Sequence, residues 1–341
     1  MSTKKLFNPQ GDDTIQGRTI IHGDTTNLLN LNEVKYQWAT GLYRVMTNNT
    51  WFPEKVNLTE DTTGYANLTE DEARAYKGIL SFLIFLDSIQ TNNLPNFNDY
   101  ITAPEVNLIL AIQTYQEAIH SQSYQTILES IVPKEERDEI LYFWRDDKIL
   151  LDRNKYIGDI YEELRSDPSD HTLFKSLVAN FLLESLYFYN GFAFFDTLAD
   201  QGKMVGSEKM IAYIRRDELT HITIFSNIMM EIKKEFPDVW GEQLIYDMVE
   251  KAVEQEIEWS NHILGDKILG INTESIENYT KWLANDRLKM LKMKPLYKKV
   301  VNPYKHLERF QEMNDDRTNF FESTVINYTQ SSGLAGSWDD F

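Results

Sequence analysis

Apolar residues recur every three or four positions along most of the chain, a spacing typical of amphipathic helices rather than strands. Several helix-start signals accompany it: Thr69 with Glu72 matches a capping box, Pro104 suits a first helical turn, and Ser207 can act as an N-cap. Strand signals are scarce, so we expect an all-α fold. The pattern predicts helices over 26–48, 69–90 and 104–131, one or two within 134–165, one from 168 to about 199, one opening near 207, and others over roughly 238–264 and 273–292.

One apolar stretch, residues 177–195, has about the length of a membrane span. It contains Asn180, Glu184 and Asn190, and no second span accompanies it. We therefore interpret it as a helix buried in a soluble core. Glu184 is then a carboxylate in a place where an unpaired charge is costly.

Composition narrows the possible functions. The formal net charge of −19 argues against the basic surface that nucleic acid or an anionic membrane requires, so neither is expected as a partner. The absence of cysteine excludes disulfides, thiolate metal ligands and thiol catalysis, and is compatible with a reducing cytosol. The N-terminus lacks the apolar stretch of a signal peptide, which favours a cytoplasmic protein.

Three segments are expected from the changes in composition along the chain. Residues 1–25 are polar and predict an irregular arm, and 26–325 predict the helical domain. Residues 326–341 end in small residues followed by an acidic, aromatic WDDF, which predicts a flexible docking tail.

Ionisable residues follow a repeated order along four apolar helices. Glu117 and His120 form a Glu-x-x-His motif, whose members share one helical face. The motif recurs at Glu218 and His221, and each copy is preceded by an acid on an earlier helix. These acids are Asp87 and Glu184. One acid from each of two helices and a Glu-x-x-His from each of two others is the ligand set of a ferritin-like dimetal-carboxylate bundle.

This ligand set suits a particular chemistry. Four carboxylates nearly balance two divalent cations, and bridging carboxylates hold such ions about 3.5–4 Å apart. Oxygen and imidazole donors suit iron or manganese. Each part alone is ambiguous: a single Glu-x-x-His arises by chance on acidic helices, and either histidine or Asp87 alone could be a structural residue. The set in its order is what predicts the metal site.

The sequence resembles the small, radical-generating beta subunit of class I ribonucleotide reductase from Trp51 to Phe341. The residues that carry the resemblance are FLDSIQ (85–90), EAIHSQSY (117–124), LLESLYFYNGF (182–192), RRDELTH (215–221) and the aromatic, acidic C-terminal tail. The resemblance implies a ferritin-like bundle with additional helices. It also implies that one ion is held by Asp87, Glu117 and His120 and the other by Glu184, Glu218 and His221.

The same resemblance assigns a radical site. Tyr124, one helical turn beyond His120, matches the tyrosine that the family oxidises to a stable radical. Phe188, Phe192 and Ile214 match the apolar pocket that shields it. Considered alone, Tyr124 would be a core tyrosine with a satisfied hydroxyl.

Radical export is implied by three further matches. Trp51 matches the tryptophan of the long-range electron-transfer chain, and Asp217 matches the acid that links it to His120. A physical reason supports Asp217, because a metal-bound histidine usually donates its other N–H to a carboxylate. Tyr328 matches the mobile tail tyrosine that relays the radical across the subunit interface. Considered alone, Trp51 would be a packing residue.

The resemblance also implies partners. Because the family reduces ribonucleotides with thiols of a large alpha subunit, a chain without cysteine would supply the radical and dock that subunit through its tail. A homodimer is implied as well. Di-iron is the expected cofactor, with dimanganese possible and then a flavoprotein activator needed. Some relatives carry tryptophan where this chain has Gln113. This difference affects what the resemblance implies about early electron delivery to the site, and not the site itself.

Two other functions remain open at this stage. A dimetal oxidase or oxygenase acting on a small molecule or fatty-acyl chain would need a substrate cavity at the metals and no docking tail. A metal-storage or structural helical protein would have no use for Tyr124, Trp51 and the tail.

Overall fold

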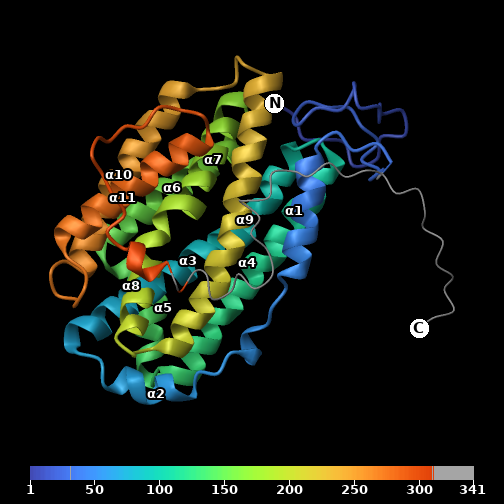
Figure 1. The fold of residues 1–341 in the computed structure, drawn as a ribbon. Coiled ribbons are helices and arrows are strands. Elements are labelled where there is room, and N and C mark those ends of the chain that lie inside the picture. The colour runs from blue at the N-terminus through green and yellow to red at the C-terminus, as the bar shows by residue number, and fades with distance from the viewer. Residues whose placement is uncertain (31, 309, 311–341) are drawn as a thin grey trace, which may run out of the picture.

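The computed structural model describes residues 1–30, 32–308 and 310 (Figure 1). Over these residues it is helical, without β-strands, and has a single antiparallel bridge between Ile21 and Ile101. None of its helices combines the length and apolarity that crossing a membrane requires. The α-helices are α1 (Gln37–Asn48), α2 (Thr59–Ala66), α3 (Glu70–Tyr100), α4 (Pro104–Ile131), α5 (Arg137–Asp146), α6 (Lys148–Ser166), α7 (Asp170–Leu182), α8 (Tyr189–Asp200), α9 (Val205–Glu235), α10 (Glu242–Ile263) and α11 (Thr273–Met290).

Local sequence signals explain how the central pair of helices begins. The predicted capping box is present at the start of α3, where the Thr69 hydroxyl accepts a hydrogen bond from the Glu72 backbone N–H and the Glu72 carboxylate accepts one from the Thr69 N–H. Pro104 occupies the first turn of α4, as predicted. Helix α3 runs ten residues past its predicted end at Gln90, to Tyr100, with Pro95 inside it. Burial of Leu94, Phe97 and Tyr100 sustains the helix there.

Two predicted helix starts are wrong. The helix predicted from residue 26 begins only at Gln37, because the backbone N–H groups of Lys35 and Tyr36 donate to the Glu105 carboxylate of α4 (3.0 and 3.1 Å) and not to a helical turn. Ser207 does not cap α9, which begins two residues earlier at Val205. The backbone N–H and the hydroxyl of Ser207 donate instead to an Asp61 carboxylate oxygen at 2.6 and 2.7 Å.

The apolar stretch 177–195 is buried, as predicted, but it is not one regular helix. Helix α7 gives way to a π-helical turn, η3 (Leu183–Tyr187), and α8 follows. A π turn inserts an extra residue into the helix, which redirects the side chains it carries. Glu184 lies in this turn.

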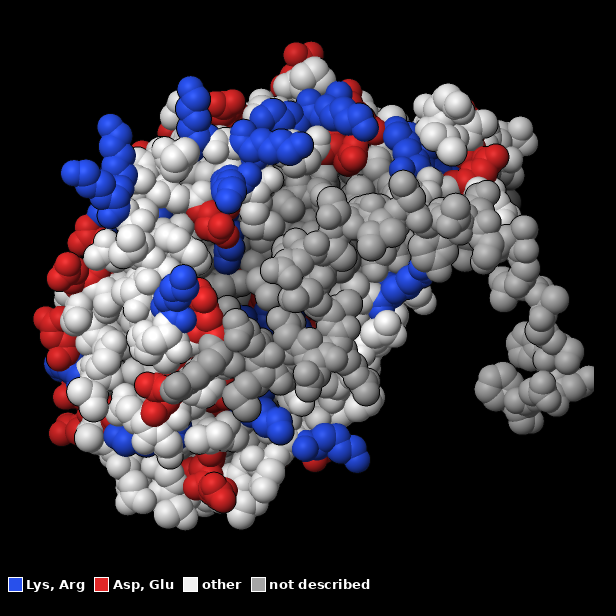
Figure 2. Space-filling view, in the orientation of Figure 1, with Lys and Arg blue, Asp and Glu red and all other residues white. Residues whose placement is uncertain are grey.

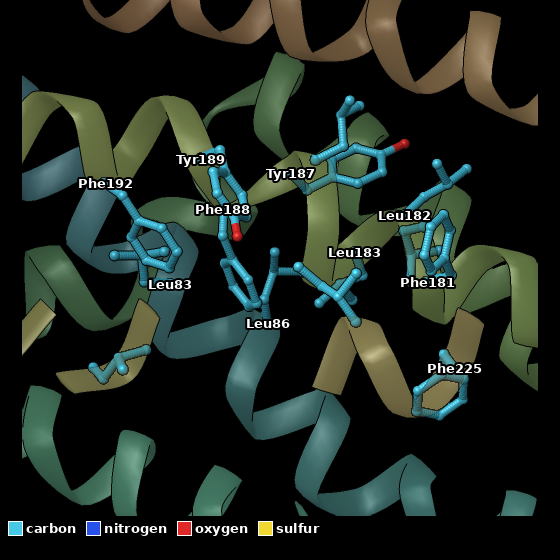
Figure 3. Close-up of a cluster of buried hydrophobic side chains, with 14 of the residues drawn as sticks. Leu83, Leu86, Phe181, Leu182, Leu183, Tyr187, Phe188, Tyr189, Phe192 and Phe225 are labelled. Atoms are coloured by element: carbon cyan, nitrogen blue, oxygen red, sulfur yellow. The ribbon is translucent and has the colours of Figure 1, made fainter. Parts of the chain in front are cut away.

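The helices surround one hydrophobic core. Helix α4 packs against α3 and α9, and α9 also packs against α7 and α8. Helix α1 covers α4 and α9 on one side, whereas α10 and α11 pack together and contact η3 on the other (Figure 1). Phe188, Phe192, Leu83 and Leu86 lie together in this core (Figure 3). Basic and acidic side chains both spread over the face drawn in Figure 2.

Candidate metal centre

The six residues predicted to bind metal come together in the middle of the bundle. They form two overlapping groups, and within each group one potential ligand atom per residue lies within 4.8 Å of the others. Glu117 and Glu218 belong to both groups, so each faces both candidate ion positions. All six side chains are fully buried. The groups are Asp87, Glu117, His120 and Glu218, and Glu117, Glu184, Glu218 and His221.

Both histidines turn the same ring nitrogen toward the carboxylates. His120 Nδ1 lies 3.1 Å from Glu218 Oε1, and His221 Nδ1 lies 3.1 Å from Glu117 Oε1 and 2.9 Å from Glu218 Oε2. Helical spacing explains only the contact of each histidine with the glutamate three residues earlier, at 3.5 Å for His120 and Glu117 and 2.9 Å for His221 and Glu218. The contacts between the two helices depend on their packing. Each histidine thus has Nδ1 available to a metal ion.

The electrostatics of the cluster favour a bound cation. Burial, followed by the charge of Glu117, raises the pKa of Asp87 well above its usual range, and burial followed by Glu218 does the same to the pKa of Glu184. Both Asp87 oxygens, both Glu117 oxygens and His120 Nδ1 make no hydrogen bond within the described residues. Buried polar atoms rarely remain unsatisfied. Two divalent cations would pair these atoms and offset the charge, so the residues fit a dimetal site.

The outer ring nitrogens have different partners. His120 Nε2 lies 3.3 Å from Asp217 Oδ2, and the same oxygen accepts a hydrogen bond from Trp51 Nε1 at 2.8 Å. His221 Nε2 instead lies 3.0 Å from the amide oxygen of Gln116. A continuous set of contacts therefore joins Trp51 and Asp217 to the candidate ligand His120.

Tyr124 lies on α4, one turn after His120, and is fully buried. Burial, followed by the nearby Asp87 carboxylate, raises the pKa of its phenol well above the usual value. The apolar residues Phe188, Phe192 and Ile214 are buried in the same hydrophobic core. Phe188 and Phe192 stack with their ring centroids 5.7 Å apart (Figure 3).

Several neighbours of the site escaped sequence reasoning. Tyr213 stacks on Trp51, with ring centroids 5.0 Å apart and planes 23° apart. The Arg216 guanidinium lies over the ring of Tyr213, 5.3 Å from its centroid. Tyr213 is four residues before Asp217, so helical spacing from Asp217 could have revealed it. Gln90 and Gln116 were also missed, and the contacts of Gln113 and Asn180 with Glu184 were not foreseen.

Two predictions fall outside the site as described. Tyr328 and the C-terminal docking tail lie outside the described residues.

A pocket of about 420 Å³ lies between α9 and α11, and none of the candidate ligands lines it. Its lining residues are Leu219, Ile222, Asp286, Arg287, Lys289 and Met290.

Comparison with known proteins gives consistent matches. A family model described as "Ribonucleotide reductase, small chain" matches residues 28–303. The ribonucleoside-diphosphate reductase subunit beta of Treponema pallidum is 44% identical over 340 residues, covering 98% of this chain and 97% of that protein. The protein of the same name from Halalkalibacterium halodurans is 36% identical and covers 98% of each chain.

Solved structures agree. The ribonucleotide reductase R2 subunit from Clostridium botulinum superposes with a TM-score of 0.88 at 44% identity, covering 91% of this chain and 99% of that one. The dimanganese(II)-NrdF protein of Streptococcus sanguinis, at 19% identity and a TM-score of 0.72, shares the fold over 83% of this chain and 98% of its own. The predicted all-α, ferritin-like fold is confirmed.

Proposed function

The chain belongs to the ribonucleotide reductase small-chain family, as its resemblance predicted, and we propose that it forms a stable radical on Tyr124 and passes the oxidising equivalent to a large catalytic subunit. That subunit would then reduce ribonucleotides to deoxyribonucleotides. The observation that carries the proposal is the fully buried Tyr124 one turn from His120, on the same centre that Asp217 connects to Trp51.

Two metal ions would be held by the six buried residues of the centre, with Glu117 and Glu218 facing both. Oxygen and imidazole donors without a soft ligand suit iron or manganese, and we propose di-iron, with dimanganese and a flavoprotein activator as the alternative. When bound, the metal pair would activate oxygen, which is the oxidant that removal of an electron and a proton from the phenol requires.

Tyr124 itself would hold the radical. Because burial and Asp87 raise the pKa of the phenol, its hydroxyl keeps its proton until oxidation removes an electron and the proton together. The radical then persists only while water and reductants are kept away. The enclosed position of Tyr124 in the core that contains Phe188, Phe192 and Ile214 supports this role.

Export would proceed from this centre through His120, Asp217 and Trp51. The short contacts between these three side chains support a path for an electron, because each is buried and directly joined to the next. The family works with a large subunit and forms dimers. We propose that Tyr328 continues the path and that the WDDF tail docks the partner; both lie outside the described residues.

The decisive experiment is electron paramagnetic resonance after metal-free protein is loaded anaerobically with Fe(II) and exposed to oxygen. A tyrosyl signal in the wild type that disappears in Tyr124→Phe would support both the radical site and di-iron competence. Two bound irons without a radical would point to manganese with an activator, tested by repeating with Mn(II) and a flavoprotein. Failure there as well would favour a dimetal oxidase acting on a small molecule.

A further inference from the structure

One oxygen of Glu184 is surrounded by amides. Its Oε1 accepts hydrogen bonds from Gln90 Nε2 at 2.5 Å and Gln113 Nε2 at 3.1 Å, and Asn180 Nδ2 approaches it at 3.5 Å. These three residues come from α3, α4 and α7 and are all fully buried, as is Glu184. The other oxygen, Oε2, makes no hydrogen bond within the described residues and lies 3.9 Å from His221 Nδ1.

We propose that Gln90, Gln113 and Asn180, here called the amide cluster, are positioning residues that reserve Glu184 Oε1 and leave only Oε2 for a metal ion. This inference rests on the metal site of the proposed function. It assigns a purpose to side chains that would otherwise be poor choices for a core. A buried amide costs free energy unless its hydrogen bonds are made.

Gln113 illustrates this cost most clearly. Its side-chain N–H donates to Glu184, whereas its carbonyl oxygen has no hydrogen-bond partner within the described residues. An apolar side chain of similar size would avoid leaving that oxygen unpaired. The hydrogen bond to Glu184 is the compensation that the structure provides.

The orientation of the amide cluster is itself fixed. The Tyr161 hydroxyl donates to Gln90 Oε1 at 2.9 Å, and Gln90 Nε2 also donates to Asn180 Oδ1 at 2.8 Å. Reversing the Gln90 amide would place its carbonyl oxygen against the Glu184 carboxylate. The Glu184 carboxylate and the Asn180 oxygen, which are both acceptors, therefore favour the orientation in which Gln90 donates to Glu184, and the Tyr161 hydroxyl then pairs the remaining Gln90 oxygen.

Glu184 differs in this respect from two other carboxylates of the site, Asp87 and Glu117. Both oxygens of Asp87 and both of Glu117 make no hydrogen bond within the described residues, so each can use either oxygen. Glu117 also belongs to both candidate groups, as expected of a residue that faces two ions. The amide cluster thus makes Glu184 a one-sided ligand beside two unrestricted ones.

The test is Mn(II) binding to metal-free protein, with unbound Mn(II) measured by electron paramagnetic resonance. Gln113→Met keeps the length of the side chain and removes its donor. Since loss of a residue that orients a ligand typically weakens metal binding about 10- to 100-fold, we expect one ion of the variant to bind that much more weakly and the other with wild-type affinity. Gln125→Met, at an exposed position of the same helix, should bind both ions like the wild type.

Three results would overturn the inference. Unchanged affinity for both ions would show that the amide cluster does not position Glu184 for metal binding. An equal loss for both ions together with a lower melting temperature would make Gln113 a folding residue. A wild type that binds no pair of ions would overturn the metal site as well, which distinguishes that failure from the first two. If Gln113→Met does not fold, Gln90→Met carries the same expectation and the same refutations.

Discussion

Asp217→Asn should weaken the connection between Trp51 and the metal centre while leaving the shape of the site intact, because an asparagine cannot accept from Trp51, His120 and Arg216 together. In the wild type, Asp217 Oδ2 accepts from Trp51 Nε1 at 2.8 Å and lies 3.3 Å from His120 Nε2, while Oδ1 lies 3.6 Å from the Arg216 guanidinium. An asparagine has one oxygen and one N–H₂ group for these positions. Whichever way it turns, a donor faces a donor, so at least one of these interactions is lost.

The size of the effect follows from the burial and charge of the acceptor. Asp217 is 1% exposed, so solvent hardly screens its interactions. A hydrogen bond to a charged group contributes about 1.5–3 kcal/mol, which corresponds to roughly 10- to 150-fold in a rate or an equilibrium. We therefore expect deoxyribonucleotide formation with the large subunit to fall by that factor.

The assay separates radical transfer from radical formation. The rate of deoxyribonucleotide formation is divided by the Tyr124 radical per chain, measured by electron paramagnetic resonance, and the metal content is determined in parallel. Asp247→Asn, at an exposed position of α10, serves as the matched control. Wild-type turnover per radical in Asp217→Asn would refute transfer through Asp217. A radical yield that falls in proportion to turnover would place its effect at the metals instead.

Four further perturbations test other parts of the structure. Phe188→Ala should cost about 3–5 kcal/mol of unfolding free energy, because it leaves a cavity in the core. It should also shorten the lifetime of the Tyr124 radical, because the apolar pocket loses a ring; an unchanged decay of the paramagnetic signal would contradict the shielding role. Tyr213→Leu removes the ring stacked on Trp51, a contact contributing about 0.5–1.5 kcal/mol, and should slow turnover per radical. Tyr213→Phe keeps the ring and should keep the wild-type turnover per radical. Equal rates in the two variants would show that stacking does not affect radical transfer. Mn(II) at about 100 times its dissociation constant should stabilise the metal-free protein by about 2.7 kcal/mol per site in urea titrations, and the absence of any shift would argue against the site. Finally, burial raises the pKa of Glu208 to about 7 from its ordinary 4.5, so the folded protein loses stability as pH rises through that range. In urea unfolding of the metal-free protein, Glu208→Gln should therefore recover about 3 kcal/mol of unfolding free energy at about pH 8 and nothing at about pH 4. An equal effect at both pH values would reject this assignment.

The starts and ends of the helices show where local signals suffice. Helix α4 begins at Pro104 and ends at Ile131, as its pattern predicts, because its first-turn proline and apolar periodicity are properties of neighbouring residues. The start of α1 could not be predicted in this way. Its upstream backbone N–H groups are bound by Glu105, and no local rule relates residues about seventy positions apart.

In the candidate site, too, some features follow from local sequence and others from tertiary packing. The sequence by itself determined that Glu117 and His120, and likewise Glu218 and His221, share a helical face, because 3.6 residues per turn fixes neighbours at i and i+3. Only the tertiary structure decided that Glu117 and Glu218 face both candidate ion positions and that amides from three helices bind Glu184. Such contacts depend on the rotation and offset of one helix against another. Those are set by the packing of the whole core, which no single stretch of sequence specifies.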